Sequence, residues 1–116
     1  MPTKVRKILN EFKQKLKRLY GNRLKGVYLF GSYARDDYED GSDLDVLVIL
    51  DTFRFHNTEI SRTADLVSDL SLEYLITVSP MYIRERDWLA GKKPLLRNVK
   101  TEGIKLYERR KQSAVV

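Results

Sequence analysis

Two aspartates, Asp43 and Asp45, stand at the head of an apolar run and are separated by a single leucine. Side chains two positions apart on a β-strand point to the same face, so the two carboxylates are expected side by side while Leu44 faces the core. Like charges this close raise one pKa unless a cation lies between them. Mg²⁺ is the simplest cation for paired hard oxygen ligands, and it usually brings phosphates with it.

A glycine–serine pair, Gly31 and Ser32, follows the preceding apolar run. Glycine lets backbone approach a bulky anion, and Ser32 adds a hydroxyl and an N–H at an expected helix N-terminus, where phosphate is favoured. Arg35, one helical turn later, can reach the same phosphate with its planar guanidinium. Together with divalent ions on Asp43 and Asp45, these groups predict phosphoryl or nucleotidyl transfer. The sequence has no Walker-type Gly-Lys-Ser/Thr loop, which excludes P-loop enzymes.

The elements that must position these residues follow from the hydrophobic pattern. Helical spacing of apolar residues predicts a helix over residues 3–20, and β-type patterns predict strands over residues 24–30 and 44–50. A second helix is expected over residues 59–74, with Thr58 as its N-cap and an apolar face of Ile60, Ala64, Val67 and Leu70. An edge strand containing Pro80 is expected over residues 75–83. The remaining expected elements are a helical turn over 84–89, a helix over 95–101 and a strand over 104–107. This order predicts an α/β (α+β) fold with a small mixed β-sheet and flanking helices.

The bulk composition is that of one soluble domain. The chain has 116 residues, which we divide into a domain over 1–108 and a flexible tail over 109–116. It has no cysteine, no bilayer-length apolar run and no secretory signal at its start, so we expect a cytoplasmic protein without disulfides or membrane contact. The net charge of +6 suits an anionic partner, and it serves solubility equally well.

The spacing of Gly31-Ser32, ten residues, then Asp43-Leu44-Asp45 resembles the signature of the DNA polymerase β-like nucleotidyltransferase superfamily. Within that superfamily, the Gly-Ser-Tyr-Ala-Arg opening and Ser42 directly before the carboxylates look most like the minimal nucleotidyltransferases. Segments 70–74 and 102–108 resemble that group too, so the likeness covers nearly the whole chain. The resemblance implies the polymerase β-like nucleotidyltransferase fold.

The resemblance also implies an activity and a partner. The activity is Mg²⁺-dependent transfer of a nucleoside monophosphate, usually AMP from ATP, with pyrophosphate leaving. Such minimal domains often are antitoxins of a small helical HEPN protein, and they adenylylate a tyrosine of that toxin. The residues carried over by position are, for the nucleotide, Gly31, Ser32, Arg35 and Ser42 and, for the metal and catalysis, Asp43 and Asp45.

A third carboxylate on a later strand is common in the superfamily, and this sequence departs from that pattern. The expected strand over residues 75–83 contains no Asp or Glu, so Glu73, just before it, is the nearest candidate for a third catalytic residue. Without a third carboxylate the chain could bind nucleotide yet transfer it slowly or not at all. The alternative hypothesis is therefore a catalytically weak or inactive binding module that neutralises a HEPN partner by complex formation.

The basic charge prompts one more hypothesis, a transferase that modifies nucleic acid. The basic segments lack the interleaved aromatic residues that stack on bases, and no RNA-binding extension is evident, so we do not expect a nucleic-acid partner. His56, the single histidine, is expected in a loop and is assigned no role. The sequence leaves homo- and hetero-oligomers open.

Overall fold

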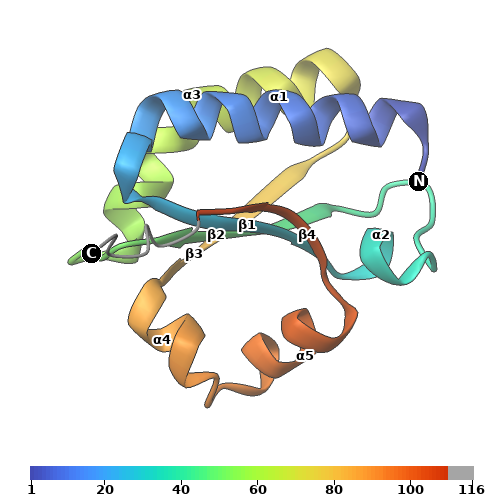
Figure 1. Cartoon of the computed structure of the whole chain (residues 1–116). Coiled ribbons are helices and arrows are strands. Elements are labelled where there is room, and N and C mark those ends of the chain that lie inside the picture. Colours follow the sequence, from blue (N-terminus) through green and yellow to red (C-terminus); the bar gives the residue numbers. More distant parts are fainter. Residues whose placement is uncertain (110–116) are drawn as a thin grey trace, which may run out of the picture.

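A four-stranded mixed β-sheet lies between two pairs of helices in the computed structural model, which describes residues 1–109 (Figure 1). The strands are β1 (Leu24–Phe30), β2 (Leu44–Leu50), β3 (Val78–Arg84) and β4 (Ile104–Glu108). The helices are α1 (Thr3–Tyr20), α2 (Ser32–Arg35), α3 (His56–Tyr74), α4 (Glu85–Ala90) and α5 (Pro94–Glu102), with a 3-10 turn η1 at Gly21–Arg23. Apart from Arg109, the tail predicted over residues 109–116 lies outside the described residues.

The strand order is β3-β2-β1-β4. Strand β1 pairs antiparallel with both β2 and β4, whereas β2 and β3 are parallel, which confirms the predicted mixed sheet. Strand β3 lies at an edge, where Pro80 is tolerated because its missing N–H faces away from the neighbouring strand. The predicted helix over residues 3–20 and the strands over 24–30 and 44–50 are confirmed at both ends.

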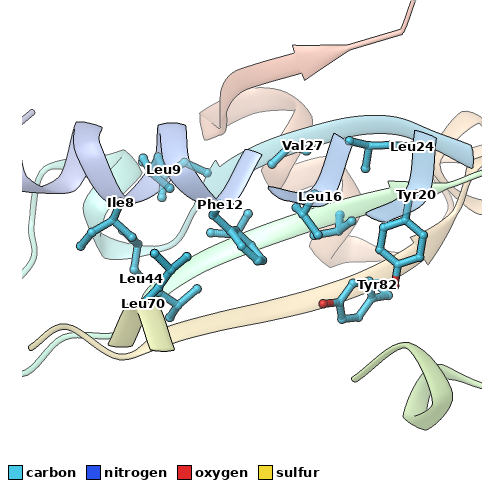
Figure 2. Close-up of a cluster of buried hydrophobic side chains, with 14 of the residues drawn as sticks. Ile8, Leu9, Phe12, Leu16, Tyr20, Leu24, Val27, Leu44, Leu70 and Tyr82 are labelled. Carbon is cyan, nitrogen blue, oxygen red and sulfur yellow. The ribbon is translucent and has the colours of Figure 1, made fainter. Parts of the chain in front are cut away.

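Helices α1 and α3 cover one face of the sheet and enclose the larger core (Figure 1). Helix α1 contributes a stripe of buried residues at helical spacing, and Figure 2 shows this stripe facing buried side chains of β1, β2 and α3. The central strand β2 is buried on both faces, and its even-numbered residues point into this core. Those residues are Leu44, Val46, Val48 and Leu50.

Helices α4 and α5 cover the opposite face and enclose a smaller core. The odd-numbered residues Leu47 and Ile49 of β2 point to this side and pack with Leu96 and Val99 of α5. Because side chains alternate along a strand, Asp45 belongs to the same face as Leu47. The carboxylates at the head of β2 are therefore on the α5 side of the sheet. Among residues 1–109, none of the helices combines the length and apolar character needed to cross a bilayer.

One sequence prediction for α3 is wrong, and a second is right only in part. The helix begins at His56 with Phe55 as its N-cap, so Thr58 lies inside the first turn instead of capping it. The predicted apolar face is right in its second half, where Leu70 is buried and Val67 packs against the core. It is wrong in its first half, because Ile60 is 42% exposed while Glu59 is only 3% exposed. Contacts with other parts of the fold, and not the local helix propensity, decide where α3 begins and which of its faces is buried.

Those contacts come from two tyrosines that satisfy the buried polar residues of α3. The hydroxyl of Tyr20 donates to Glu59 Oε1 at 2.9 Å, and the hydroxyls of Thr63 and Tyr82 are hydrogen-bonded to each other. His56 joins the same region, since its Nε2 accepts the backbone N–H of Tyr82 at 3.1 Å. The interface between α1, α3 and β3 is thus a buried polar network at one end and an apolar core along the rest.

The third strand begins at Val78, three positions later than the sequence predicts. Leu75 ends α3 in the left-handed conformation (φ 56°), which turns the chain before it can enter the sheet. The backbone N–H of Val78 then bonds to the hydroxyl oxygen of Ser71, and the carbonyl of Thr77 accepts the N–H of Leu44. These bonds fix the start of β3 beside the start of β2.

Candidate active site

The turn that joins β1 to α2 needs glycine at position 31. Gly31 has φ 74° and ψ −156°, a combination that is essentially restricted to glycine. A Cβ at this position would lie 2.2 Å from Oδ2 of Asp45, well inside van der Waals contact. The close approach follows from the register of the sheet, in which Phe30 is paired with Asp45. The glycine–serine turn and the second aspartate are therefore in direct contact, as the sequence motif predicts.

Ser32 opens α2, a single helical turn held by the carbonyl of Gly31. That carbonyl accepts the backbone N–H groups of Ala34 and Arg35, each at 3.1 Å. The turn places the guanidinium of Arg35 3.1 Å from Asp37 and 3.9 Å from Oε2 of Glu102 on α5. Arg35 thus bridges from its own loop to the opposite wall of the site.

The carboxylates of Asp43 and Asp45 are the electrostatic centre of the site. Asp45 is half-buried, whereas Asp43 is exposed. Burial raises the pKa of Asp45, the carboxylate of Asp43 raises it further, and the guanidinium of Arg35 opposes both effects. The predicted repulsion between the two aspartates is thus present in the structure, and it falls on the more buried residue.

The substitution Asp45→Asn should stabilise the ligand-free protein at neutral pH. The folded state raises the pKa of Asp45, so ionising this carboxyl disfavours folding once the pH exceeds the unfolded value. Asparagine removes that charge and keeps the side-chain shape. Thermal unfolding should show a higher Tm for the variant at pH 7, and the gain should vanish below about pH 4, where the carboxyl is protonated in both states. Asp65→Asn on the exposed side of α3 is the control, and a gain in Tm that does not change with pH would contradict the interpretation.

A cleft of about 400 Å³ lies between the glycine–serine turn and α5. Four of the residues predicted from the sequence line it together: Gly31, Ser32, Arg35 and Asp45. The opposite wall comes from α5 and was not predicted. The only sequence signal for this wall is the spacing of four residues at i, i+3, i+4 and i+7 on one helical face, namely Leu95, Asn98, Val99 and Glu102.

Three further candidates are not among the residues that line this cleft. Asp43 directly precedes β2 and is exposed beside the cleft. The hydroxyl oxygen of Ser42 accepts the backbone N–H of Glu39 at 2.9 Å, so it braces the loop before β2. Glu73 is exposed near the end of α3, a helix that packs on the sheet face opposite to Asp45. The structure does not bring Glu73 together with the two aspartates.

The position beside Asp45 on the neighbouring strand is occupied by Ser79. This is where a carboxylate of β3 would share a face with Asp43 and Asp45. Across residues 1–109, no group of three or more His, Cys, Asp and Glu side chains is arranged to hold a metal ion. The candidate active site therefore consists of the aspartate pair and the cleft beside it.

Comparison with known proteins gives the family. The family model described as a nucleotidyltransferase domain matches residues 5–106. Two proteins of Methanocaldococcus jannaschii, each named "Putative protein adenylyltransferase", are similar over most of the chain. One is 38% identical over 104 residues, which cover 87% of this chain and 96% of that protein. The other is 37% identical over 106 residues, covering 88% of this chain and 71% of that protein.

Solved structures share the fold. A chain of a toxin–antitoxin crystal structure with AMP-PNP superposes with a TM-score of 0.60 and 24% identity, covering 86% of this chain and 73% of that chain. A chain from the complex of a tri-AMPylated Shewanella oneidensis HEPN toxin with its MNT antitoxin superposes with a TM-score of 0.55 and 23% identity, covering 90% of this chain and 73% of that chain. With the family match over most of its length, the chain belongs to the nucleotidyltransferase domain family.

Proposed function

We propose that this protein is a Mg²⁺-dependent protein adenylyltransferase that moves AMP from ATP to a hydroxyl group of a partner protein in the cytoplasm. The observation that supports this most is the single cleft formed by the glycine–serine turn, Arg35 and Asp45. The adenylyltransferase name of the M. jannaschii relatives supports the reaction class. The HEPN toxin found with an MNT antitoxin in a structural neighbour supports a HEPN-type partner and an antitoxin role.

Each residue of the cleft has its own role in binding a triphosphate. Gly31 leaves room for the carboxylate of Asp45 to lie against the turn, and Ser32 offers a hydroxyl and an N–H to phosphate oxygens in the same cleft. The planar guanidinium of Arg35 can donate two parallel hydrogen bonds to a phosphate. Because Asp45 contacts Gly31, the proposed metal-binding carboxylate lies directly beside the proposed phosphate-binding turn.

Asp43 and Asp45 fit Mg²⁺ by the chemistry of their donors. They offer hard oxygen ligands at the head of β2. Burial first and the carboxylate of Asp43 second raise the pKa of Asp45, and a bound cation would favour the ionised form of both carboxyls. Mg²⁺ commonly takes one or two carboxylates and completes its coordination with waters and substrate phosphates, so two aspartates suffice to hold it. When bound, the ion supplies positive charge that stabilises the charge developing on the departing phosphates.

The proposed reaction is one displacement at phosphorus. The acceptor hydroxyl oxygen forms a bond to the α-phosphorus of ATP, and the bond from that phosphorus to the bridging oxygen breaks. Pyrophosphate leaves with the electron pair of the broken bond, and the hydroxyl proton passes to solvent water. The contribution of this chain is to hold the triphosphate in line and to neutralise its charge with Arg35.

The test is label transfer. The protein is mixed with ATP labelled in the α-phosphate, Mg²⁺ and the product of the neighbouring gene, and the label on that product is measured. We expect transfer by the wild type and none by Asp43→Asn/Asp45→Asn. The matched control is Asp65→Asn/Asp69→Asn, which makes the same charge change on exposed positions of α3. Equal transfer by the two double variants, or no transfer by the wild type, contradicts the proposal.

A second candidate function is a binding module that neutralises its partner by occlusion. The observation that favours it is Ser79, which occupies the place beside Asp45 where a third carboxylate would lie. In this case Asp43→Asn/Asp45→Asn should still form the complex and still inhibit the partner without ATP. Inhibition that needs both ATP and the two aspartates would rule it out.

A further inference from the structure

We propose that α5 forms the nucleoside subsite of the cleft and that the carboxylate of Glu102 accepts hydrogen bonds from the ribose hydroxyls, so that the site selects ribonucleotides. This assignment rests on the proposed function, because it takes the glycine–serine side of the cleft as the triphosphate side. It concerns the α5 side of the cleft, whose residues lie outside the glycine–serine and aspartate motif.

One face of α5 lines the cleft from end to end. Leu95, Asn98, Val99 and Glu102 recur at the spacing of a single helical stripe and all line the same cavity. The seven steps from Leu95 to Glu102 make the stripe about 10 Å long at the α-helical rise, which is close to the length of a ribose and a base placed end to end. The volume of about 400 Å³ lies within the range of small-ligand pockets.

The two ends of this stripe differ in their distance from the phosphate side. Glu102, the last residue of α5, lies 3.9 Å from the guanidinium of Arg35. Gly103 holds this end close to β1, because a Cβ there would come within 3.2 Å of the carbonyl oxygen of Leu29. Figure 1 shows the C-terminal end of α5 on the same side as α2, with the rest of the helix running beneath the sheet. The order away from the phosphates is thus Glu102, then Asn98 and Val99, then Leu95.

The chemistry of the lining follows the order of a nucleotide. Next to the phosphates, a carboxylate acts only as a hydrogen-bond acceptor, which suits the two donor hydroxyls of a ribose. Further along, the partly exposed side chains of Phe30 and Leu95 provide apolar surface for the flat faces of a base, and the amide of Asn98 can both donate and accept at its edge. Arg35 lies between Glu102 and the phosphates and offsets the repulsion between these negative groups.

The experiment measures binding, with no acceptor protein present. Calorimetric titrations in Mg²⁺ buffer compare ATP with 2′,3′-dideoxy-ATP, which carries the same triphosphate and base. The wild type should bind ATP roughly tenfold more tightly than the dideoxy analogue, because a hydrogen bond to a charged group is lost with the hydroxyls. Glu102→Ala should bind the two nucleotides equally. Thr101→Ala, an exposed neighbour on the same turn, should keep the wild-type ratio.

The ratio of the two affinities isolates the ribose. Removing Glu102 also frees Arg35, but that change acts equally on both triphosphates and cancels in the ratio. Equal binding of both nucleotides by the wild type, or a ratio that survives in Glu102→Ala, overturns the assignment alone. No binding of ATP at all by the wild type overturns the proposed function, and the assignment with it.

Discussion

Replacing Gly31 with alanine should weaken ATP binding about 100-fold, because the new Cβ collides with a carboxylate of the proposed site. A 100-fold loss of affinity corresponds to about 3 kcal/mol, since each 1.4 kcal/mol is about tenfold. The new Cβ would lie 2.2 Å from Asp45 Oδ2, so either the aspartate or the turn must move. Both movements disturb the contact between the phosphate-binding turn and the carboxylates. Titration of Gly31→Ala with ATP and Mg²⁺ gives the measurement.

The matched control is Gly41→Ala in the loop before β2. Gly41 also has a positive φ, 87°, yet a Cβ there would meet no atom within 4 Å. This variant carries backbone strain without the collision at Asp45, so it should fold less stably and still bind ATP. If the two alanine variants bind ATP equally well, then the close packing of Gly31 against Asp45 is not what the site requires.

Replacing Tyr20 with phenylalanine should lower the free energy of unfolding by about 2 kcal/mol, the usual cost of removing a hydrogen bond to a charged, buried group. Burial raises the pKa of Tyr20 and the hydrogen bond to Glu59 raises it further, so its hydroxyl stays protonated and donates. Without it, the partner that residues 1–109 leave to the buried carboxylate is the guanidinium of Arg62, 3.4 Å away on the exposed side. Denaturant unfolding with the m-value checked measures the loss.

A double-mutant cycle separates two contributions to the loss of stability. One is the Glu59 carboxylate left without its hydrogen bond, and the other is the removal of the hydroxyl group itself. Glu59→Gln removes the charge, so Tyr20→Phe should cost less in that background than in the wild type. Tyr38→Phe, which changes a half-buried ring in the loop after α2, should shift the free energy of unfolding by much less. Additive effects of the two substitutions in the cycle would mean that Tyr20 and Glu59 do not stabilise each other.

The half of the site on β1, α2 and β2 follows from the sequence, because it depends on local rules. Alternation along a strand places Asp43 and Asp45 on one face, and the loop between β1 and β2 returns the chain antiparallel to itself. That return brings Gly31 against Asp45 without help from any distant segment. The boundaries of α1, β1 and β2 are predictable for the same reason, since each is fixed by its own pattern of apolar residues.

The other half depends on contacts between segments far apart in the chain. Nothing local indicates that the stripe ending at Glu102 faces Gly31, because that contact arises only when β4 returns beside β1. The first half of the buried face of α3 is missed for a related reason, since Glu59 looks like a solvent-facing residue until Tyr20 is brought against it. Propensity at Thr58 favours a cap, yet the helix extends past it to His56, whose imidazole bonds to β3.

Arg35 already has two negative neighbours before any ligand arrives. Asp37 lies 3.1 Å and Glu102 3.9 Å from its guanidinium, and both carboxylates are about half exposed. Exposed pairs of this kind are worth at most about 1 kcal/mol each, so an incoming anion can exchange with them at little cost. A lone phosphate merely replaces one weak anion with another, whereas a polyphosphate brings several charges into the exchange at once. The free protein thus carries its own anions at Arg35, and any phosphate group that binds this guanidinium has to compete with them.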